Sequence, residues 1–471
     1  MSAVLDGKLA LARAVGTLSR LRGGGATSAP GKVLMRIEPH AIGALGSRLT
    51  QGSALISATN GKTTTAAMAA AILRRAGVAL VHNQAGANMA GGIATTLLAA
   101  ARGRGAIAGE LGLFEVDELW LGPVAEELRP RAILLGNLFR DQLDRYGELE
   151  RIADSWREVL EARPARLVLN ADDPLVADLG RGQPDVVFFG VQDDSLALPG
   201  MSHAADAKHC RRCGAPYVFD AVYLGHLGHY HCPSCGQTRP APDVWASDVR
   251  LEGVHGSRFS LQNGSETGEV SLSLPGLYNV YNALAAAALA SALEIPFATT
   301  LAGLGDVRAA FGRAESVTLS PTPANGTGAP ALTEPRELQI MLVKNPAGAN
   351  EVLRTLLLEP GEHDLLGVLN DAIADGRDVS WILDADFELL AQRIREVTCS
   401  GTRAADLAAR LKYAGVEEAR IRVEPELGAA LAQAAADRPD ARAPLYALPT
   451  YTAMLALREL LVARGEASSA W

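Results

Sequence analysis

A glycine–lysine loop near residue 60 carries the clearest chemistry in the sequence. The run Ser57-Ala58-Thr59-Asn60-Gly61-Lys62-Thr63-Thr64-Thr65 stands between an apolar segment, 54–57, and a segment of helical composition, 66–76. Backbone N–H groups at such a helix start can bind phosphates, the Lys62 ammonium can reach the terminal phosphates, and the Thr63 hydroxyl can hold Mg²⁺. The strict phosphate-loop pattern fails, because Ile56 stands where its first glycine belongs. The order of strand, loop and helix favours nucleotide binding over a chance Gly-Lys-Thr sequence.

Four of the five cysteines form two close pairs. Cys210 and Cys213 are two residues apart, eighteen residues follow, and Cys232 and Cys235 repeat the spacing. Four thiolates in this pattern suit tetrahedral Zn²⁺ and leave no open position for catalysis, so a structural zinc site is predicted, with a redox role as the alternative. The histidines that compete as ligands are expected on the surface of this zinc ribbon: His209, His226, His229 and His231. Cys399 stands alone and is expected to be a small buried apolar residue.

Acidic and amide side chains follow three expected strands. They lie in the stretches 114–118, 137–147 and 170–174, the last reading Asn170-Ala171-Asp172-Asp173-Pro174. In an open parallel sheet, ligands bind at the carboxyl ends of the strands. Each stretch by itself is more readily explained as a helix cap or a solvated loop than as a ligand site. The presence of three such stretches after the phosphate loop in the sequence favours a site in which a carboxylate helps to hold Mg²⁺.

Alternating strands and helices must position these groups. Short apolar runs at 54–57, 131–135, 166–169 and 186–189 alternate with helical segments, which is typical of βαβ units and a parallel sheet. An insert at 203–241, rich in Cys and His, interrupts the alternation. Two strand-like stretches, 258–261 and 270–274, and an Ala-rich helix, 279–293, follow the insert.

The alternation restarts beyond a proline-rich linker at 318–335. Strands are expected at 338–343, 364–369, 379–383, 396–399 and 420–423, and a helix at 350–358. The expected organisation is an N-terminal helix with a short lead-in (1–50), a central domain (51–317), the linker, and a C-terminal α/β, Rossmann-like domain (336–471). The N-terminal helix, with Leu11, Val15 and Leu18 on one face, is expected to dock on the domain surface or to touch a membrane surface.

Composition excludes several classes of function. The 471 residues include 44 Lys+Arg and 53 Asp+Glu, a net charge of −9, which offers no basic face to nucleic acid. No apolar run approaches the roughly 20 residues of a membrane-spanning helix, and Arg13 and Arg20 interrupt the only stretch that resembles a signal peptide. Paired cysteines suit a reducing compartment. We expect a cytoplasmic protein, and the N-terminal helix leaves peripheral contact with the inner face of the membrane open.

Five stretches in order along the chain together resemble the Mur ligase superfamily. They are 59–64, Asn137 to Asp144, 170–174, Gly276-Leu277-Tyr278-Asn279-Val280-Tyr281-Asn282-Ala283 and Gly312-Arg313-Ala314-Glu315. The four-cysteine insert, the stretch 140–148, Lys344-Asn345-Pro346-Ala347-Gly348 and the stretch 374–381 narrow the resemblance to the MurT family. The resemblance covers about Gly31 to Arg458. It implies a Mur ligase-like central phosphate-loop domain that carries a zinc ribbon, followed by the C-terminal domain.

The resemblance implies the ligase subunit of a two-subunit amidotransferase in peptidoglycan synthesis. Such a subunit phosphorylates the α-carboxyl of the D-isoglutamyl residue in the lipid II stem peptide, using ATP and Mg²⁺. Ammonia then attacks the acyl phosphate and gives D-isoglutamine, ADP and phosphate. A class I glutaminase-like partner, GatD, supplies the ammonia. No glutaminase signature is present in this chain.

The same resemblance assigns individual residues. Those implied at the ATP phosphates are Thr59, Asn60, Gly61, Lys62, Thr63 and Thr64, with Lys62 catalytic and Thr63 on Mg²⁺. Glu115 matches the catalytic glutamate that holds Mg²⁺, with Glu110 as its rival, and Asn279 and Asn282 would lie by the adenine. Arg313 would reach the nucleotide from the domain boundary. Of three aspartates in the C-terminal domain, Asp371, Asp375 and Asp378, we favour Asp378 to complete the partner's catalytic Cys–His pair; a turn or cap is the other reading of this region.

Three departures from the superfamily pattern stand out. Ala58 replaces a glycine of the loop, and Gln142 stands where many Mur ligases have a histidine that helps to hold a second Mg²⁺, which leaves that metal open. The region before the phosphate loop is too short for a nucleotide-sugar-binding domain, which suits a lipid-linked substrate. Two alternatives remain: a stand-alone Mur or folylpolyglutamate-type amino-acid ligase, and a zinc-ribbon scaffold with an inert nucleotide site.

Overall fold

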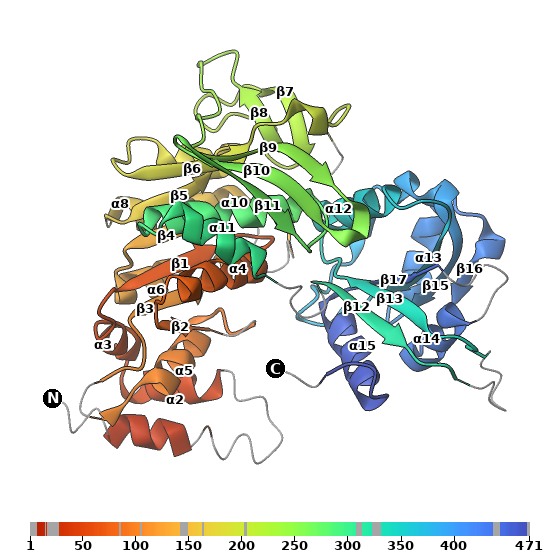
Figure 1. The fold of residues 1–471 in the computed structure, drawn as a ribbon, viewed down its shortest axis with the longest axis horizontal. Helices are drawn as coiled ribbons and strands as arrows, with labels where there is room; N and C mark the ends of the chain where they lie inside the picture. Colours follow the sequence, from red (N-terminus) through yellow and green to blue (C-terminus); the bar gives the residue numbers. More distant parts are fainter. Residues whose placement is uncertain are drawn as a thin grey trace.

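The computed structural model describes residues 7–14, 16, 28–83, 86–103, 106–141, 149–162, 164–201, 205–307, 313–322, 331–436 and 443–468. Within these residues the chain forms a nine-stranded sheet, a six-stranded sheet and a two-stranded hairpin. Figure 1 shows the large sheet and the six-stranded sheet as the centres of two units, with the C-terminal unit following the first along the chain. No helix among the described residues is long and apolar enough to cross a membrane.

The nine-stranded sheet contains the expected parallel core. Its order is β11-β10-β9-β6-β5-β4-β1-β3-β2, with antiparallel pairing only between β9, β10 and β11. The strands are β1 (Ser53–Ser57), β2 (Leu80–His82), β3 (Leu111–Glu115), β4 (Ala132–Leu135), β5 (Arg166–Asn170), β6 (Val186–Val191), β9 (Val244–Leu251), β10 (Ser257–Asn263) and β11 (Glu266–Leu272). The central strands β1, β3 and β4 are buried at every position, because helices cover both faces of the sheet. Continuous apolar runs were therefore a sufficient signal for β1 and β4.

Two hydrophobic cores lie on opposite faces of this sheet. One is formed with α4 (Lys62–Arg75), α10 (Leu277–Ala292) and α11 (Phe297–Gly305). The other is formed with α2 (Ala29–Ile37), α3 (Ala41–Gly46), α5 (Ala90–Ala100), α6 (Leu121–Leu128) and α8 (Leu149–Ala162). The short α9 (Pro174–Ala177) follows β5. Helix α10 has no polar stripe because it is buried over nearly its whole surface.

The N-terminal region differs from the expected single helix. Residues 7–14 are helical, and α2 and α3 add two further helices before β1. The helix buries Leu9 and Ala12, while Leu11 is 56% exposed. The prediction that the face with Leu11 docks on the domain was therefore wrong. Val15 and Leu18 lie outside the described residues. A docking contact exists all the same, because the Arg13 guanidinium donates to the carbonyl oxygens at the end of α5.

The insert forms a hairpin, β7 (Val218–Leu224) and β8 (Leu227–His231), beside the cysteines. In Figure 1 this hairpin lies beyond β9 at the outer end of the central unit. Hydrogen bonds join the hairpin to segments that follow β5 and β6, among them Leu198 N–H to Val222 O (2.7 Å) and Gly228 N–H to Asp172 O (3.0 Å). The insert is therefore built onto the central domain.

The C-terminal sheet has the order β12-β13-β17-β14-β15-β16, parallel except for β12. Its strands are β12 (Arg313–Leu319), β13 (Arg336–Met341), β14 (His363–Val368), β15 (Ile394–Ser400), β16 (Ile421–Val423) and β17 (Leu445–Pro449). Its helices are α12 (Pro346–Leu357), α13 (Ala404–Tyr413), α14 (Leu427–Ala435) and α15 (Tyr451–Ala463). The expected domain boundary after residue 317 falls inside β12, which pairs with β13. Proline-rich sequence after β12 suggested a linker, but Thr322 and Leu332 still pair across it.

One expected C-terminal strand is a 3₁₀ turn instead. Residues Ser380–Leu383 form η5, and Leu383 is 67% exposed. The Asp378 carboxylate accepts the Ser380 N–H (2.8 Å) and closes a turn at the start of this segment, which competes with strand pairing. Cys399 is fully buried in β15, and burial raises the pKa of its thiol to about 12, in keeping with a packing role.

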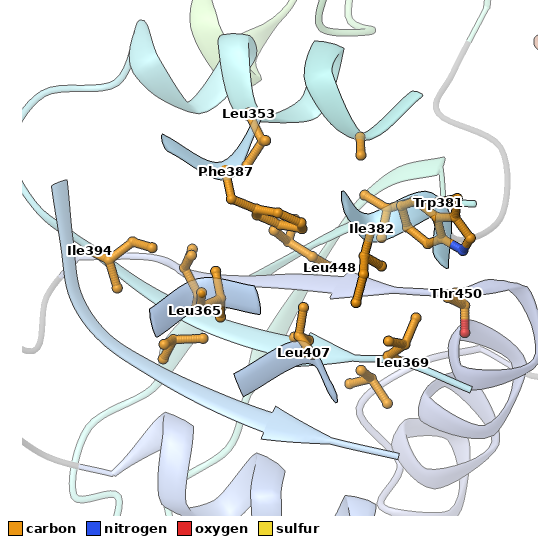
Figure 2. Close-up of a pocket in the computed structure, with 16 residues that line it drawn as sticks. Leu353, Leu365, Leu369, Trp381, Ile382, Phe387, Ile394, Leu407, Leu448 and Thr450 are labelled. Carbon is orange, nitrogen blue, oxygen red and sulfur yellow. The ribbon is translucent and has the colours of Figure 1, made fainter. Parts of the chain in front are cut away.

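Figure 2 shows the packing beneath η5 and η6 (Phe387–Leu389) in the C-terminal unit. Trp381, Ile382 and Phe387 point toward leucines of β14 and α13 and enclose an apolar cavity of about 30 Å³. That volume is close to the space of one water, and the lining offers water almost no hydrogen-bond partner. This cavity is a gap in the core and offers no ligand site.

Candidate functional site

A cavity of about 370 Å³ lies where the central unit meets the C-terminal unit. One part of its wall is the phosphate loop with the carboxyl ends of β3 and β4, a second part is α10, and a third part is α12 with the residues before it. This is the volume of a small-molecule site, at the edge of the parallel sheet where such sites form.

The phosphate loop connects β1 to α4 and is held by its neighbour strand. Gly61 has a φ of +83°, and a Cβ built there would lie 2.0 Å from Asn282 Oδ1, so only glycine fits. Asn137, just beyond β4, binds the loop at three points. Its carbonyl oxygen accepts Thr59 N–H (2.9 Å), its Oδ1 accepts Asn60 N–H (2.9 Å), and its amide donates to Asn60 O (3.0 Å). The loop therefore has one conformation before any ligand binds.

Lys62 lies among carboxylates at the first turn of α4. Its ammonium donates to Ala58 O and to Glu118 Oε2, the latter at 2.9 Å. Burial alone would lower the pKa of this ammonium, but the negative charge of Glu118, and then of Glu115, raises it above its ordinary value. Lys62 is therefore charged at neutral pH, and an incoming anion competes with Glu118 for it. The sequence analysis did not predict that Glu118 binds Lys62. The signal available for it was its position in an acidic run after an expected strand.

Glu115 and Thr63 face each other across the phosphate loop. The Thr63 hydroxyl donates to Glu115 Oε2 (2.9 Å), and Asn88 Nδ2 approaches Oε1 at 3.3 Å. Asn83, which sequence reasoning missed, fixes the backbone of Glu115 by accepting its N–H (2.9 Å) and donating to its C=O (2.9 Å). A hydroxyl and a carboxylate in contact beside a phosphate loop are oxygen ligands of the kind that Mg²⁺ takes.

Glu110, the rival of Glu115, lies at the other end of the same strand. It precedes β3, is exposed, and accepts Gln51 Nε2 (3.2 Å). Five residues of extended chain separate the two glutamates, about 16 Å along the strand. Glu115 lines the cavity and Glu110 does not. The geometry thus favours Glu115 as the residue close to the phosphate loop.

Asn279 and Asn282 lie on the first turns of α10 and are buried in the cavity wall. Asn282 Nδ2 donates to Asn279 Oδ1 (3.0 Å), and Asn282 Oδ1 accepts the Thr65 hydroxyl (3.2 Å). Asn279 Nδ2 is bound to Pro275 O (2.7 Å). The two amides therefore join α10 to α4 directly behind the phosphate loop.

The C-terminal unit also reaches the phosphate loop. The Lys344 ammonium donates to Thr59 O (3.1 Å) and pairs with the Asp141 carboxylate. The side chains of Asn345 and Asn60 are hydrogen-bonded to each other (2.9 Å). Sequence reasoning used Lys344 only for the resemblance. No local signal brings residue 344 to residue 59, because the contact depends on how the two units pack.

Asp172 and Asp173 are structural, contrary to the expectation that their stretch faces the ligand. Both are fully buried. Asp173 accepts Leu138 N–H (2.8 Å) and caps α9, while Asp172 accepts the Tyr281 hydroxyl (2.7 Å) and Val191 N–H (2.8 Å). Their hydrogen bonds are thus directed into the protein, where they join β5, β6 and α10.

His226 also differs from its expected place on the insert's surface. It is fully buried, its ring centroid lies 4.7 Å from that of Phe139, and its Nε2 lies 3.4 Å from Asp173 Oδ2. His209 is exposed, and His229 and His231 are partly exposed. None of these histidines belongs to the cysteine cluster found among the described residues.

Two further predicted positions lie outside the described side chains, and the three C-terminal aspartates differ in exposure. Arg313 begins β12, but its side chain lies outside the described part of the structure, as does Gln142. Asp375 is buried and accepts the N–H (2.7 Å) and hydroxyl (2.5 Å) of Thr452, at the start of α15. Asp371 accepts the Thr402 hydroxyl (2.9 Å). Asp378 is exposed, away from the cavity, and the hydrogen bonds from Ser380 lower the pKa of its carboxyl.

The four paired cysteines form one cluster. All four sulfurs lie within 4.8 Å of one another, with Cys210 Sγ 3.6 Å from Cys235 Sγ and Cys213 Sγ 3.5 Å from Cys232 Sγ. Four sulfurs around zinc at about 2.3 Å are separated by roughly 3.8 Å, so the arrangement fits such an ion. The Ala215 N–H lowers the pKa of Cys213 to about 6. Although the Gln237 N–H opposes the effect, burial and the neighbouring sulfurs raise the pKa of Cys235 to about 11. The four sulfurs are therefore close enough together to hold a metal ion.

Comparison with known proteins agrees with this geometry. The Mur ligase middle domain family matches residues 56–213, and the MurT ligase C-terminal family matches residues 342–454. A pseudomurein peptide ligase type C from Methanothermus fervidus superposes with a TM-score of 0.64 at 23% identity, covering 89% of this chain and 80% of that one. MurF ligase from Thermotoga maritima, solved in complex with ADP, gives 0.59 at 15% identity, covering 94% and 84%.

These two family matches place the chain among the Mur ligases. Within that class, the subunit MurT of lipid II isoglutaminyl synthase (glutamine-hydrolyzing) from Staphylococcus aureus (strain N315) is 31% identical over 452 residues, 96% of each chain. The chain belongs to the MurT family.

The two glutamates at opposite ends of β3 give a matched test of the site. Glu115→Gln should weaken Mg²⁺-dependent ATP binding at least tenfold, because it removes the charge that faces Thr63. Isothermal titration with ATP, with and without Mg²⁺, measures this effect. The control, Glu110→Gln, should bind within twofold of the wild-type protein. A loss confined to Glu110→Gln would reverse the assignment.

Proposed function

We propose that this protein is the ATP-dependent ligase subunit of a lipid II isoglutaminyl synthase. It would amidate the α-carboxyl of D-isoglutamate in the lipid II stem peptide to D-isoglutamine. The single observation that carries the proposal is the phosphate loop, with Lys62, Thr63 and Glu115 converging on one cavity, in a chain that belongs to the MurT family along nearly its whole length.

A carboxylate must be activated before ammonia can replace one of its oxygens. Its oxygen is a poor leaving group, so transfer of the γ-phosphoryl group of ATP to that oxygen forms an acyl phosphate and ADP. Ammonia then adds to the acyl carbon, phosphate leaves with the C–O electron pair, and the nitrogen gives up a proton to form the amide. Lys62 would move from Glu118 to the phosphates and neutralise their charge, while loop N–H groups orient them. Thr63 and Glu115 are the residues that would hold Mg²⁺, which supplies charge neutralisation when bound.

The phosphate-loop residues have distinct parts in this proposal. Thr59, Asn60, Gly61 and Thr64 would shape the phosphate cradle, and Asn279 and Asn282 would set the place of the nucleoside. Both amides pack directly behind the loop, which supports that assignment. Arg313 is proposed to reach the nucleotide from the start of β12.

We also propose that the four-cysteine cluster binds Zn²⁺ as a structural ion. Two matching turns present the sulfurs: Gly214 N–H donates to Cys210 O (2.8 Å), and Gly236 N–H donates to Cys232 O (3.0 Å). Both glycines have positive φ, which these turns require. A cluster saturated by four protein sulfurs has no open position for a substrate, so its part is to hold the insert together.

A partner subunit completes the proposed reaction. The relative's name describes a glutamine-hydrolysing enzyme of which MurT is a subunit, so we propose that a GatD-like class I glutaminase supplies ammonia to this chain. Among the three C-terminal aspartates, Asp375 is committed to capping α15 and Asp371 to Thr402. Asp378 is exposed, and its lowered pKa keeps it ionised, so it is the proposed acceptor for the partner's catalytic histidine.

Amidation can be tested without the partner. Incubation of lipid II with this protein, ATP, Mg²⁺ and ammonium chloride should give a product about one mass unit lighter, as carboxylate becomes amide. Lys62→Ala should reduce the rate at least 100-fold, because it removes the ammonium that lies at the phosphate loop between Ala58 O and Glu118, and its metal content should stay unchanged. Mass spectrometry of the lipid follows the reaction. If no mass change occurs even with a glutaminase partner present, the amidation proposal is wrong and a stand-alone ligase or a scaffold is favoured.

Metal content tests the cysteine cluster. The purified protein should contain one zinc per chain by elemental mass spectrometry, and Cys232→Ser should lose it, since its sulfur is buried in the cluster. Cys399→Ser is the matched control, because Cys399 is buried elsewhere, in β15, and zinc should remain at one per chain. Zinc-free wild-type protein with all four thiols modifiable would contradict a metal site.

Comparing glutamine with ammonium as the nitrogen source distinguishes the partner's role from that of the ligase site. In the complex, Asp378→Asn should lower glutamine-dependent amidation at least tenfold and leave ammonium-dependent amidation unchanged, because only ammonia supply needs the partner's histidine. Asp371→Asn is the control and should retain both activities. The reverse pattern, with Asp371→Asn losing glutamine use, would transfer the role to Asp371.

A further inference from the structure

The segment after β4 lies between the phosphate loop and the four-cysteine insert. Toward the loop, the Phe139 N–H donates to the Thr59 hydroxyl (3.1 Å). Toward the insert, the Phe139 ring packs against the turn between β7 and β8. We propose that Phe139 is a positioning residue through which the insert fixes the phosphate loop, so that zinc at the cysteines and phosphate at the loop bind with positive coupling. The inference rests on the proposed function in that the loop binds phosphate and the cysteines bind zinc.

Two residues of the hairpin turn enclose the Phe139 ring. His226 is fully buried, and its ring centroid lies 4.7 Å from that of Phe139. Gly225 has a φ of +60°, and a Cβ built there would lie 2.7 Å from a carbon of the Phe139 ring. Phe139 is itself almost fully buried. The position of this ring, and with it the backbone that binds Thr59, therefore depends on where the hairpin turn lies.

The next residue along the chain, Arg140, is held by the insert as well. Its N–H donates to Asp206 Oδ2 (2.9 Å), and its guanidinium pairs with the same carboxylate, which is nearly buried. The Asp206 N–H approaches His226 Nδ1 at 3.4 Å. Two residues of the insert, Asp206 and His226, therefore contact each other and two consecutive residues of the segment after β4.

The order of the hairpin turn depends on the cysteine cluster at the other end of β8. His226 directly precedes β8 and Cys232 directly follows it, so five residues of extended chain, about 16 Å, separate the two. The buried core at the cluster consists of Cys210, Tyr217, Tyr230 and Cys232 with Ala177 of α9. A two-stranded hairpin with so small a core is marginally stable in water. A metal ion that joins the two cysteine pairs would stabilise it.

These contacts link the two binding events thermodynamically. With the hairpin turn in place against Phe139, the phosphate loop needs less ordering when an anion binds. Coupling between two binding sites is reciprocal, so phosphate must strengthen zinc binding by the same factor by which zinc strengthens phosphate binding. An insert that only holds itself together would show no such effect.

Inorganic tripolyphosphate is the probe, because it carries the phosphates without a nucleoside. Isothermal titration with tripolyphosphate and Mg²⁺ is carried out on the full chain, zinc-loaded and zinc-free, with a thiol reductant present. Zinc-loaded protein should bind the probe at least fivefold more tightly than zinc-free protein. Zinc affinity, measured by equilibrium competition with a chelator, should rise by the same factor in saturating tripolyphosphate. Lys62→Ala, which lacks the ammonium at the loop, should show no rise and measures any direct effect of tripolyphosphate on the chelator.

Substitutions at His226 test whether the coupling passes through Phe139. His226→Ala removes the ring that packs against Phe139 but no cysteine, so it should keep one zinc per chain while the coupling falls below twofold. His226→Phe keeps a ring at this position and should retain the fivefold effect. His231→Ala is the matched control, because His231 lies on the same hairpin, is partly exposed and pairs with Asp220 (3.1 Å). Its coupling should equal that of wild type.

Equal tripolyphosphate affinity with and without zinc in the wild-type protein would overturn the inference, and so would full coupling in His226→Ala. If His226→Ala loses its zinc, Phe139→Leu takes its place, with the same expected loss of coupling. If the zinc-free protein does not fold, the competition titration decides, and an unchanged zinc affinity in tripolyphosphate overturns the inference. Zinc-loaded protein that binds no tripolyphosphate would refute the proposed function too, whereas binding without coupling refutes the inference alone.

Discussion

The hydrogen bonds between Asn137 and the phosphate loop are the constraint on which the rest of the site depends. Three contacts from this one residue at the end of β4 fix both Thr59 and Asn60. A loop held in this way keeps its remaining N–H groups oriented for an anion without paying for their ordering at each binding event. The same loop is the surface that Lys344, Asn345 and Phe139 contact. This loop thus contacts two separate parts of the chain, residues 137–139 and residues 344–345.

Polar side chains at the carboxyl edge of the large sheet have two different tasks. Glu115 lines the cavity and accepts the Thr63 hydroxyl, and Glu118 binds the Lys62 ammonium. Asp172 and Asp173, which follow β5, are buried and satisfied by protein donors. A buried carboxylate without such partners would be costly, so these aspartates and the groups that bind them form one unit. The acids after β3 therefore serve the cavity, and the acids after β5 support the fold.

The cavity is composite, which has consequences for the reaction. Central domain, insert and C-terminal unit each supply part of its wall. The Lys344–Asp141 ion pair and the Asn60–Asn345 contact close the two units on each other at the phosphate loop. A phosphorylated carboxylate is prone to hydrolysis, and a site assembled from several walls excludes water more completely than an open sheet edge does. Membership of the MurT family and the geometry of this cavity both support an ATP-dependent ligase reaction.

By itself the sequence determined the features that depend on local pattern. Buried parallel strands are continuous apolar runs, the loop at Gly61 needs glycine, and paired cysteines with a fixed spacing form their own cluster. Only tertiary structure decided which end of β3 meets the phosphate loop, and so separated Glu115 from Glu110. It also buried His226 and Asp172, moved β12 into the second sheet, and brought Lys344 to Thr59. These outcomes depend on residues distant in the chain, because a side chain's surroundings are set by the neighbouring strand, helix or domain packed against it.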